Sequence, residues 1–301
     1  MEKIRIHSFQ AWLLASRPKT LMGAAVPMMI ALSMAYVDSV GHVDMSFSHW
    51  VLPALLCVAF AMLMQIDANF INDYFDFVRG NDDGTRLGPR RACAEGWVTP
   101  RAMKIAIGIV TMLACAVGLP LIYFGGWRMV LVGLACVVFC FLYTTTLSYW
   151  GLGDVLVLVF FGIVPVCVTY YILMRTLACE VFVASLACGL VIDTLLIINN
   201  YRDIDNDRRA GKNTLIVRVG AQGGRWLYLA AGFLAVLLAA VFIDVRLVLF
   251  CLPYLCLHVL TWREMCRINR GKALNLILAK TSRNMFVFGL AFSLGILLIA
   301  L

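Results

Sequence analysis

Nine apolar segments, each long enough to cross a lipid bilayer, constrain this chain more than any other feature. They cover approximately residues 20–37, 48–71, 104–124, 128–147, 153–174, 178–198, 226–243, 245–262 and 284–301. About 20 apolar residues suffice for a helix to span the hydrocarbon core. The segments are continuously apolar rather than alternating, which favours helices over barrel strands. We therefore predict an all-α, polytopic membrane protein with nine transmembrane helices, forming a single domain over residues 1–301.

Charged residues indicate the orientation of the chain. Only 14% of the residues are charged, whereas 62% are hydrophobic. With a cytoplasmic N-terminus, 22 of the 25 basic residues fall in cytoplasmic segments, the exceptions being Arg128, Arg175 and Arg246, as the positive-inside rule requires. The net charge of +8 then reflects topology and contact with anionic lipid headgroups. We expect a multi-pass protein of the bacterial inner membrane, with no nucleic-acid partner and no obligate protein partner.

Aspartates gather at the cytoplasmic ends of two predicted helices. The sequence has only 17 acidic residues, and a charge within the hydrocarbon costs about 3 kcal/mol or more, so such clusters are informative. If both helices continue past the membrane edge, Asn72 and Asp76 share one helix face. Asn199, Asp203 and Asp207 share another, because residues four apart project from the same side.

The two clusters share one sequence pattern, as expected for copies of a duplicated unit. Asn72-x-x-x-Asp76 recurs as Asn199-x-x-x-Asp203, each at the end of the second helix in a four-helix unit. This pattern predicts two pseudo-repeats, at about 10–150 and 151–262, followed by a ninth helix at about 284–301. A site at the interface between the repeats is the natural expectation.

Facing carboxylates repel one another unless cations lie between them. Carboxylate and amide oxygens without nearby His or Cys favour Mg²⁺, which proteins commonly bind together with substrate phosphates. Asp82 and Asp83 follow Gly80 in a turn-prone stretch and can fold back toward the same site. Nearby basic side chains that can hold phosphate oxygens are Arg79, Arg86, Arg208, Arg209 and Lys212. The apolar surroundings favour a diphosphate that carries a lipid tail.

The segments "NDYFDFVRGND" and "NNYRDIDNDRRAGKNTLIVRVG" resemble the two aspartate-rich motifs of the UbiA superfamily of intramembrane prenyltransferases. The longer first motif, the "GKNT" continuation and the N-terminal "SRPKTL" are similar to its 1,4-dihydroxy-2-naphthoate branch, which serves menaquinone synthesis. This resemblance implies nine helices with both motifs cytoplasmic. It also implies transfer of a polyprenyl chain to the naphthoate with loss of CO₂ and diphosphate, giving demethylmenaquinol.

The resemblance also implies roles for particular residues. Metal and diphosphate ligands would be Asn72, Asp76, Asn199, Asp203 and Asp207, with Asp82 or Asp83 replacing the acid usually found where Gly80 stands. Lys212 and Arg17 are similar to diphosphate contacts. Tyr143 resembles the tyrosine beside the reacting allylic carbon, whereas Leu147 stands where many relatives have a basic residue. The implied catalytic set is Asp76, Asp203, Asp207 and Tyr143.

The expected chemistry needs two Mg²⁺ ions, a prenyl diphosphate and an aromatic acid. Metal ions stabilise the leaving diphosphate, and the electron-rich ring attacks the allylic carbon while the protein excludes water. Tyr143 can stabilise the positive charge through its ring face. Arg90 or Arg91 can meet the acceptor carboxylate before it is lost.

Other interpretations stay open. 4-Hydroxybenzoate is the alternative acceptor, a cation-coupled secondary transporter is an alternative class, and a membrane phosphatidyltransferase also uses an aspartate array. Tyr143 can be an ordinary interfacial tyrosine, and Arg17 and Lys19 can serve topology alone. Asp154 can be a helix cap or an acceptor ligand. Asp67 and Asp193 can be buried hydrogen-bond partners or part of the acceptor pocket.

Overall fold

The computed structural model describes residues 4–41, 43–80 and 86–300. Over these residues the chain is helical, and nine helical spans are long and apolar enough to cross a membrane. Six are single helices: α2 (Met22–Ser39), α4 (Pro100–Gly118), α9 (Cys179–Arg209), α10 (Leu215–Phe242), α11 (Leu247–Ile268) and α12 (Leu274–Ile299). The other three combine consecutive elements: η2 (Phe47–Val51) with α3 (Leu52–Val78), α6 (Arg128–Leu142) with η3 (Tyr143–Leu147), and α7 (Gly153–Val157) with η4 (Leu158–Ile163) and α8 (Val164–Met174). The predicted all-α class and helix number are confirmed for the described residues.

Three short helices complete the fold. These are α1 (Phe9–Ala15), η1 (Pro18–Thr20) and α5 (Leu121–Gly125). Ser8 caps α1 by accepting a hydrogen bond from the Ala11 N–H at 3.2 Å, which satisfies one of the free amides of the first turn. The short α5 divides the segment predicted as one helix over 104–124. The structure ends α4 at Gly118, and α5 begins after Pro120.

Two helices begin earlier than hydropathy predicts. α10 begins at Leu215 rather than near 226, with Thr214 as its cap and a break at Gly220, where φ is +75°; glycine adopts this conformation at little cost. α12 begins at Leu274 rather than near 284. Its first turns contain polar residues that lower the local hydropathy, yet Leu274 and Ile277 are fully buried. Tertiary packing therefore stabilises these turns.

The helix α9 lies at the centre of the bundle. It packs against α10, α12 and the η4–α8 segment, and its contact with η4 is very close. A Cβ added at Gly162 would lie 2.5 Å from the Ser185 carbonyl oxygen and 2.8 Å from the Gly189 Cα. In contrast, α4 and α6 carry exposed apolar side chains such as Ile105, Met112 and Leu134, as expected for helices that face lipid. The predicted pseudo-repeats stay a prediction.

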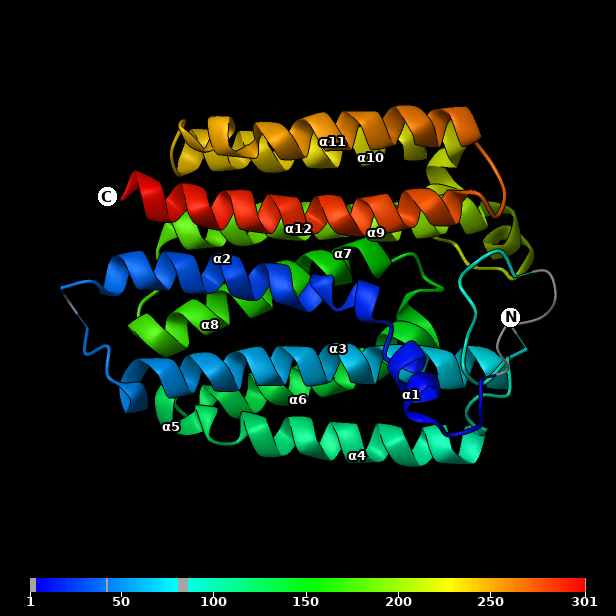
Figure 1. Ribbon diagram of the computed structural model, residues 1–301, viewed down its shortest axis with the longest axis horizontal. Coiled ribbons are helices and arrows are strands. Elements are labelled where there is room, and N and C mark those ends of the chain that lie inside the picture. The colour runs from blue at the N-terminus through cyan, green and yellow to red at the C-terminus, as the bar shows by residue number, and fades with distance from the viewer. Residues whose placement is uncertain (1–3, 42, 81–85, 301) are drawn as a thin grey trace.

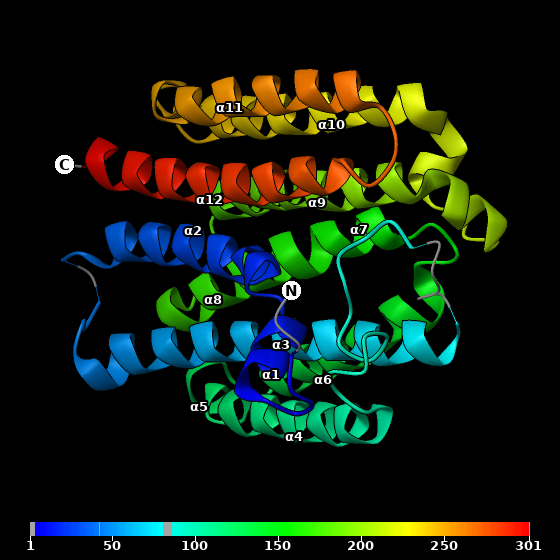
Figure 2. The ribbon, with the colours of Figure 1, turned by 45° about the vertical axis from the view of Figure 1, so that its right-hand side comes forward.

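Both aspartate motifs lie at the same end of the bundle. Figure 1 shows the loop after α3 and the turn between α9 and α10 together at its right-hand end, near α7 and the N-terminus. Figure 2 shows the same grouping after rotation. The helices continue past the apolar segments, α3 to Val78 and α9 to Arg209, so the condition for the two predicted helix faces is met.

Candidate active site

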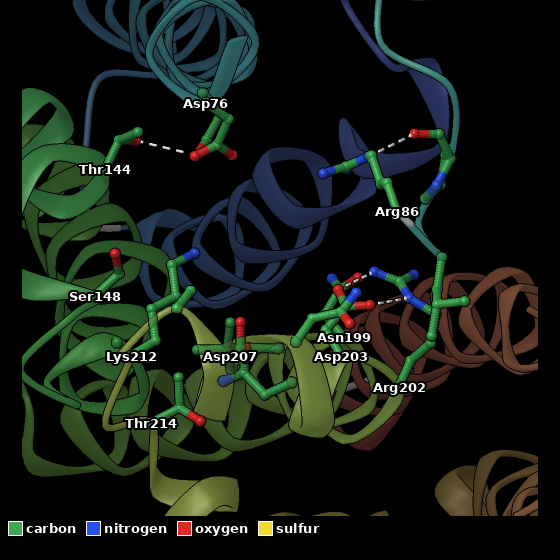
Figure 3. Close-up of a pocket in the computed structure, with 18 of the residues that line it drawn as sticks. Asp76, Arg86, Thr144, Ser148, Asn199, Arg202, Asp203, Asp207, Lys212 and Thr214 are labelled. Atoms are coloured by element: carbon green, nitrogen blue, oxygen red, sulfur yellow. Dashed lines mark hydrogen bonds and ion pairs between the residues drawn. The ribbon is translucent and has the colours of Figure 1, made fainter. Parts of the chain in front are cut away.

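A polar cavity of about 520 Å³ lies between the ends of α3 and α9, beside η3 and the start of α7. Twelve residues selected from the sequence line it: Arg17, Asn72, Asp76, Arg86, Arg91, Tyr143, Asp154, Asn199, Asp203, Asp207, Arg209 and Lys212. In Figure 3, Asp76 projects from α3 on one side of the cavity, and Asn199, Asp203 and Asp207 lie along α9 on the other side. Segments separated by more than 100 residues thus supply the two walls.

The α9 wall follows from helical periodicity. Asn199, Asp203, Asn206, Asp207 and Ala210 line the cavity, and their spacings of three, four, seven and eight residues place them on one face. The neighbouring Arg208 points away from this face. Its side chain is 59% exposed and lies 3.9 Å from the Asp205 carboxylate, and it is not among the residues that line the cavity, whereas Arg209 is.

On the α3 wall, Asp76 is paired with an arginine from the following loop. The Arg91 Nη2 lies 2.6 Å from the Asp76 Oδ2, and both side chains are about nine-tenths buried. Asp73, on the neighbouring helix face, accepts hydrogen bonds from the backbone N–H groups of Ala92 and Cys93, both at 2.9 Å. Asp73 therefore folds the loop back so that Arg91 reaches Asp76.

Asp203 is paired with its own neighbour, Arg202. The guanidinium donates from Nε to Asp203 Oδ1 at 2.9 Å and from Nη2 to Oδ2 at 2.5 Å, a two-point contact. The Arg202 Nη1 donates to the Asn275 Oδ1 at 2.8 Å, and the Asn275 amide donates to the Leu87 carbonyl at 2.7 Å. This chain of contacts joins α9, the start of α12 and the loop after α3.

The sequence interpretation had assigned Arg202 no role at the site. The sequence feature that could have indicated such a role is the position of this arginine, at the end of an apolar helix and directly before a motif aspartate. Residues one apart on a helix do not normally face each other, so that spacing argued against a pair. The structure forms the pair because the Arg202 side chain is 95% buried, where a charged group needs partners.

Arg17 lies at the inner edge of the cavity on a left-handed residue with φ of +50°. The Asn69 amide holds this segment by donating to the Ser16 carbonyl at 2.9 Å and to the Thr20 Oγ1 at 3.0 Å. The Arg17 Nη2 is buried, and no described residue accepts a hydrogen bond from it. Burial, together with the positive charge of Arg91, lowers the pKa of Arg17 to about 9. The group stays charged at neutral pH, and it favours an incoming anion.

Arg79 does not line the cavity and instead supports its wall. Its Nη1 donates to the Thr144 carbonyl at 3.1 Å and its Nη2 to the Thr145 carbonyl at 2.8 Å. Its guanidinium also lies over the Tyr149 ring, 5.3 Å from the centroid. These contacts fix η3, the segment that begins with Tyr143. Asp82 and Asp83 lie outside the described residues.

Tyr143 stands where the polar cavity meets a second, apolar one. The second cavity has a volume of about 570 Å³ and extends between α2, α3, α6 and η4. Six residues line both cavities: Arg17, Thr20, Asn72, Tyr143, Leu196 and Asn199. Deeper in the apolar cavity, the wall consists of residues such as Phe60, Met64 and Phe160. A molecule with a charged head and a long apolar tail matches this arrangement.

The side chains that line the cavity offer only some of the ligands that an Mg²⁺ ion needs, and a phosphate would supply others. Among the described residues, no three His, Cys, Asp or Glu side chains gather closely enough to hold a metal ion. The reason is that Asp76 turns to Arg91 and Asp203 turns to Arg202. The available groups are carboxylate and amide oxygens, which suit a hard cation, and Mg²⁺ commonly takes one or two carboxylates and completes its shell with phosphates and water. The residue types therefore fit Mg²⁺ accompanied by a phosphate ligand.

Of the residues whose roles the sequence leaves open, Asp154 lines the polar cavity, whereas Asp67, Lys19 and Arg90 lie outside both cavities. Asp154 lines the polar cavity and is not the cap of α7, because Leu152 occupies that position. Asp67 lines neither cavity and accepts a hydrogen bond from the Thr111 hydroxyl at 2.7 Å, which joins α3 to α4. Lys19 is exposed outside both cavities. Arg90 is also outside them and pairs with Glu95.

Comparisons with known proteins agree with this architecture. The model of the UbiA prenyltransferase family matches residues 24–289. The 1,4-dihydroxy-2-naphthoate octaprenyltransferase of Escherichia coli is 39% identical over 236 residues, which cover 75% of this chain and 73% of that protein. The enzyme of the same name from Haemophilus influenzae is 30% identical, with 99% of both chains covered.

A solved structure shares the fold. It is that of a UbiA homolog from Archaeoglobus fulgidus bound to DMAPP and Mg²⁺, with a TM-score of 0.61 over 96% of this chain and 99% of that one, at 14% identity. At this identity the likeness concerns the fold alone. The family match, however, spans all but the two ends of the chain. This multi-pass membrane protein therefore belongs to the UbiA prenyltransferase family.

Proposed function

We propose that this protein transfers a polyprenyl chain from a prenyl diphosphate to 1,4-dihydroxy-2-naphthoate, with loss of CO₂ and diphosphate, giving demethylmenaquinol. One observation carries the proposal: a cavity lined by aspartates and basic side chains opens at Tyr143 into an apolar cavity. The naphthoate is favoured as acceptor because the relatives that are at least 30% identical include several with that substrate in their names.

In this proposal the basic side chains bind the diphosphate. Arg17, Arg86 and Lys212 line the polar cavity, and Arg17 has a buried Nη2 with no acceptor among the described residues. Arginine and lysine recognise phosphate oxygens through charge-assisted hydrogen bonds. Two predicted contacts take different roles: Arg79 fixes η3 through the Thr144 and Thr145 carbonyls, and Arg208 faces away from the cavity.

The proposed metal ligands are the amides and carboxylates that line the cavity, namely Asn72, Asp76, Asn199, Asp203 and Asp207. Bound Mg²⁺ would neutralise the diphosphate and improve it as a leaving group. Asp76 pairs with Arg91 and Asp203 pairs with Arg202, so these arginines balance part of the negative charge of the proposed ligands.

Tyr143 and the apolar residues surround the reacting carbon, stabilise its positive charge and exclude water. The allylic carbon is attached to the diphosphate, so it lies where the polar and apolar cavities meet, beside Tyr143. A ring face can stabilise positive charge there, and the apolar residues exclude water that would trap a cation. The residue at position 147 is a leucine, so Arg17 and Lys212 supply positive charge from other segments.

The secondary-transporter alternative predicts acids near mid-span beside broken helices. The motif aspartates instead lie near the ends of α3 and α9, and α9 is continuous from Cys179 to Arg209. We also propose that these ends face the cytoplasm in the bacterial inner membrane, as the basic residues favour. Cysteine labelling at position 209 tests this orientation: labelling from the cytoplasm is expected, and labelling from the opposite side would overturn it.

The activity is tested by a competition between acceptors. Membranes containing the protein receive Mg²⁺, a long-chain prenyl diphosphate, and equal amounts of 1,4-dihydroxy-2-naphthoate and 4-hydroxybenzoate. The expected result is a prenylated naphthoquinol that lacks the carboxylate, identified by mass, with release of CO₂. Prenylated 4-hydroxybenzoate without any naphthoquinol would refute the acceptor, and no product from either acid would refute prenyl transfer.

A further inference from the structure

Two buried carboxyl groups, Asp154 on α7 and Asp193 on α9, have no part in the proposed diphosphate site. Their exposed fractions are 8% and 6%. In each, the Oδ1 atom is buried and has no hydrogen-bond partner among the described residues. The two helices that carry these groups, α7 and α9, pack against each other. Buried acceptors without partners are rare in proteins and call for an explanation.

The position of Asp154 points to a ligand. Asp154 lines the polar cavity, whereas Asp193 does not. The preceding residue, Gly153, approaches Tyr143 closely: a Cβ at this position would lie 3.9 Å from the Tyr143 Oη and 3.3 Å from the Leu196 Cδ2. Tyr143 and Leu196 both line the junction of the two cavities. Asp154 thus follows directly on a residue packed against this junction.

Two neighbouring carboxyl groups in low-polarity surroundings do not both ionise, because the charged forms repel and are poorly solvated. Such a pair retains one carboxylate that can accept a hydrogen bond and a proton. The same cavity holds the Asp76, Asp203 and Asp207 carboxylates, which the proposed function assigns to the metal ions. The Tyr143, Thr144 and Ser148 hydroxyls that also line it are not bases at neutral pH.

We infer that Asp154 is a catalytic residue for the acceptor: its carboxylate accepts a hydrogen bond from a ring hydroxyl of the aromatic acceptor and takes up that proton as the ring attacks. This inference rests on the proposed function. A dihydroxy aromatic acid in the cavity that Asp154 lines can offer a hydroxyl donor to this carboxylate.

The step balances in atoms and electrons. The ring carbon that carries the carboxylate forms a bond to the allylic carbon, and the bond between that carbon and the diphosphate oxygen breaks. The ring hydroxyl becomes a carbonyl as its proton passes to Asp154. Loss of CO₂ then returns the electron pair of the broken carbon–carbon bond to the ring, and the carbonyl oxygen regains its proton from Asp154. No oxidant or reductant is needed.

The first test compares two conservative variants. Asp154→Asn retains size and can still accept a hydrogen bond, but it cannot take up the proton. We expect kcat to fall by about 10²-fold or more, the usual contribution of a general base, with the KM for prenyl diphosphate unchanged. Asp67→Asn is the matched control, because Asp67 is also a buried acid with a partnerless Oδ1 and lines neither cavity; its kcat should remain that of the natural protein. Equal kcat values in the two variants would overturn the inference.

The second test uses the unmodified protein and so does not depend on folding of a variant. The two monomethyl ethers of 1,4-dihydroxy-2-naphthoate each block one hydroxyl. One ether should lose turnover by a factor similar to that of Asp154→Asn, and the same ether should lose little more in the variant, as expected for two partners of one interaction. Additive losses, or full turnover of both ethers, would refute the role of Asp154. Failure of the unmodified protein to prenylate either aromatic acid would instead refute the proposed function.

Discussion

Asn275 joins three parts of the candidate site, and its removal should reduce activity without touching substrate. Its side chain accepts from the Arg202 Nη1 at 2.8 Å and donates to the Leu87 carbonyl at 2.7 Å. In Asn275→Ala, the buried Arg202 donor loses its partner, which costs about 1–3 kcal/mol, and the neutral bond to the loop adds about 0.5–1.5 kcal/mol. The total is about 1.5–4.5 kcal/mol.

This energy holds the loop after α3 against α9 and α12, and Arg202 in turn holds Asp203. If all of it serves the arrangement that binds diphosphate, kcat/KM for the prenyl diphosphate falls about 10- to 1,600-fold, since 1.4 kcal/mol corresponds to a factor of ten. Asn275→Asp retains the acceptor for Arg202 and should recover most of the loss. Steady-state kinetics, with hydrogen exchange of residues 86–99, measures both the activity and the closure of the loop.

Tyr201→Phe is the matched control for Asn275→Ala. Tyr201 precedes Arg202 on α9 and donates to the Asn269 side chain at 3.0 Å, so the variant removes a link between α9 and the connection before α12 without altering Arg202. We expect kcat/KM close to that of the natural protein. Similar losses in the two variants, or slower turnover without faster hydrogen exchange in Asn275→Ala, would refute the proposed role of the network.

Three further predictions concern the metal ligands and the helix packing. Asp76→Asn and Asp203→Asn should each lower kcat by about 10²-fold or more, because each group supports the charge of the leaving diphosphate; near-normal rates in both would contradict the ligand assignment. EDTA should stop product formation and added Mg²⁺ should restore it, whereas turnover that is insensitive to EDTA would exclude a metal requirement. Gly162→Ala should lower the unfolding free energy by about 1–3 kcal/mol through overpacking, since its Cβ would meet the Ser185 carbonyl at 2.5 Å. Gly108→Ala, with no atom within 4 Å, should not lower the melting temperature.

Sequence patterns predicted the membrane class, the number of spanning helices found in the described residues, and most of the residues that line the candidate site. Apolar segments of about 20 residues have few stable alternatives to helices in lipid. The motif residues Asn199, Asp203 and Asp207 lie on one face because helical periodicity is a local property. The boundaries were less certain: Leu274 begins α12 ten residues before the hydropathic limit, because buried contacts stabilise polar turns that hydropathy discounts.

Which charged side chains pair with each other depends on the tertiary structure. Arginine side chains are long, and they reach partners on several elements, so the sequence did not distinguish Arg79, which fixes η3, from Arg91, which pairs with Asp76. The same holds for Arg208, which faces outward, and Arg202, which is buried against Asp203. A buried charge takes whichever partner the fold brings near it. That choice depends on how α3, α9 and α12 pack, which no local pattern in the sequence specifies.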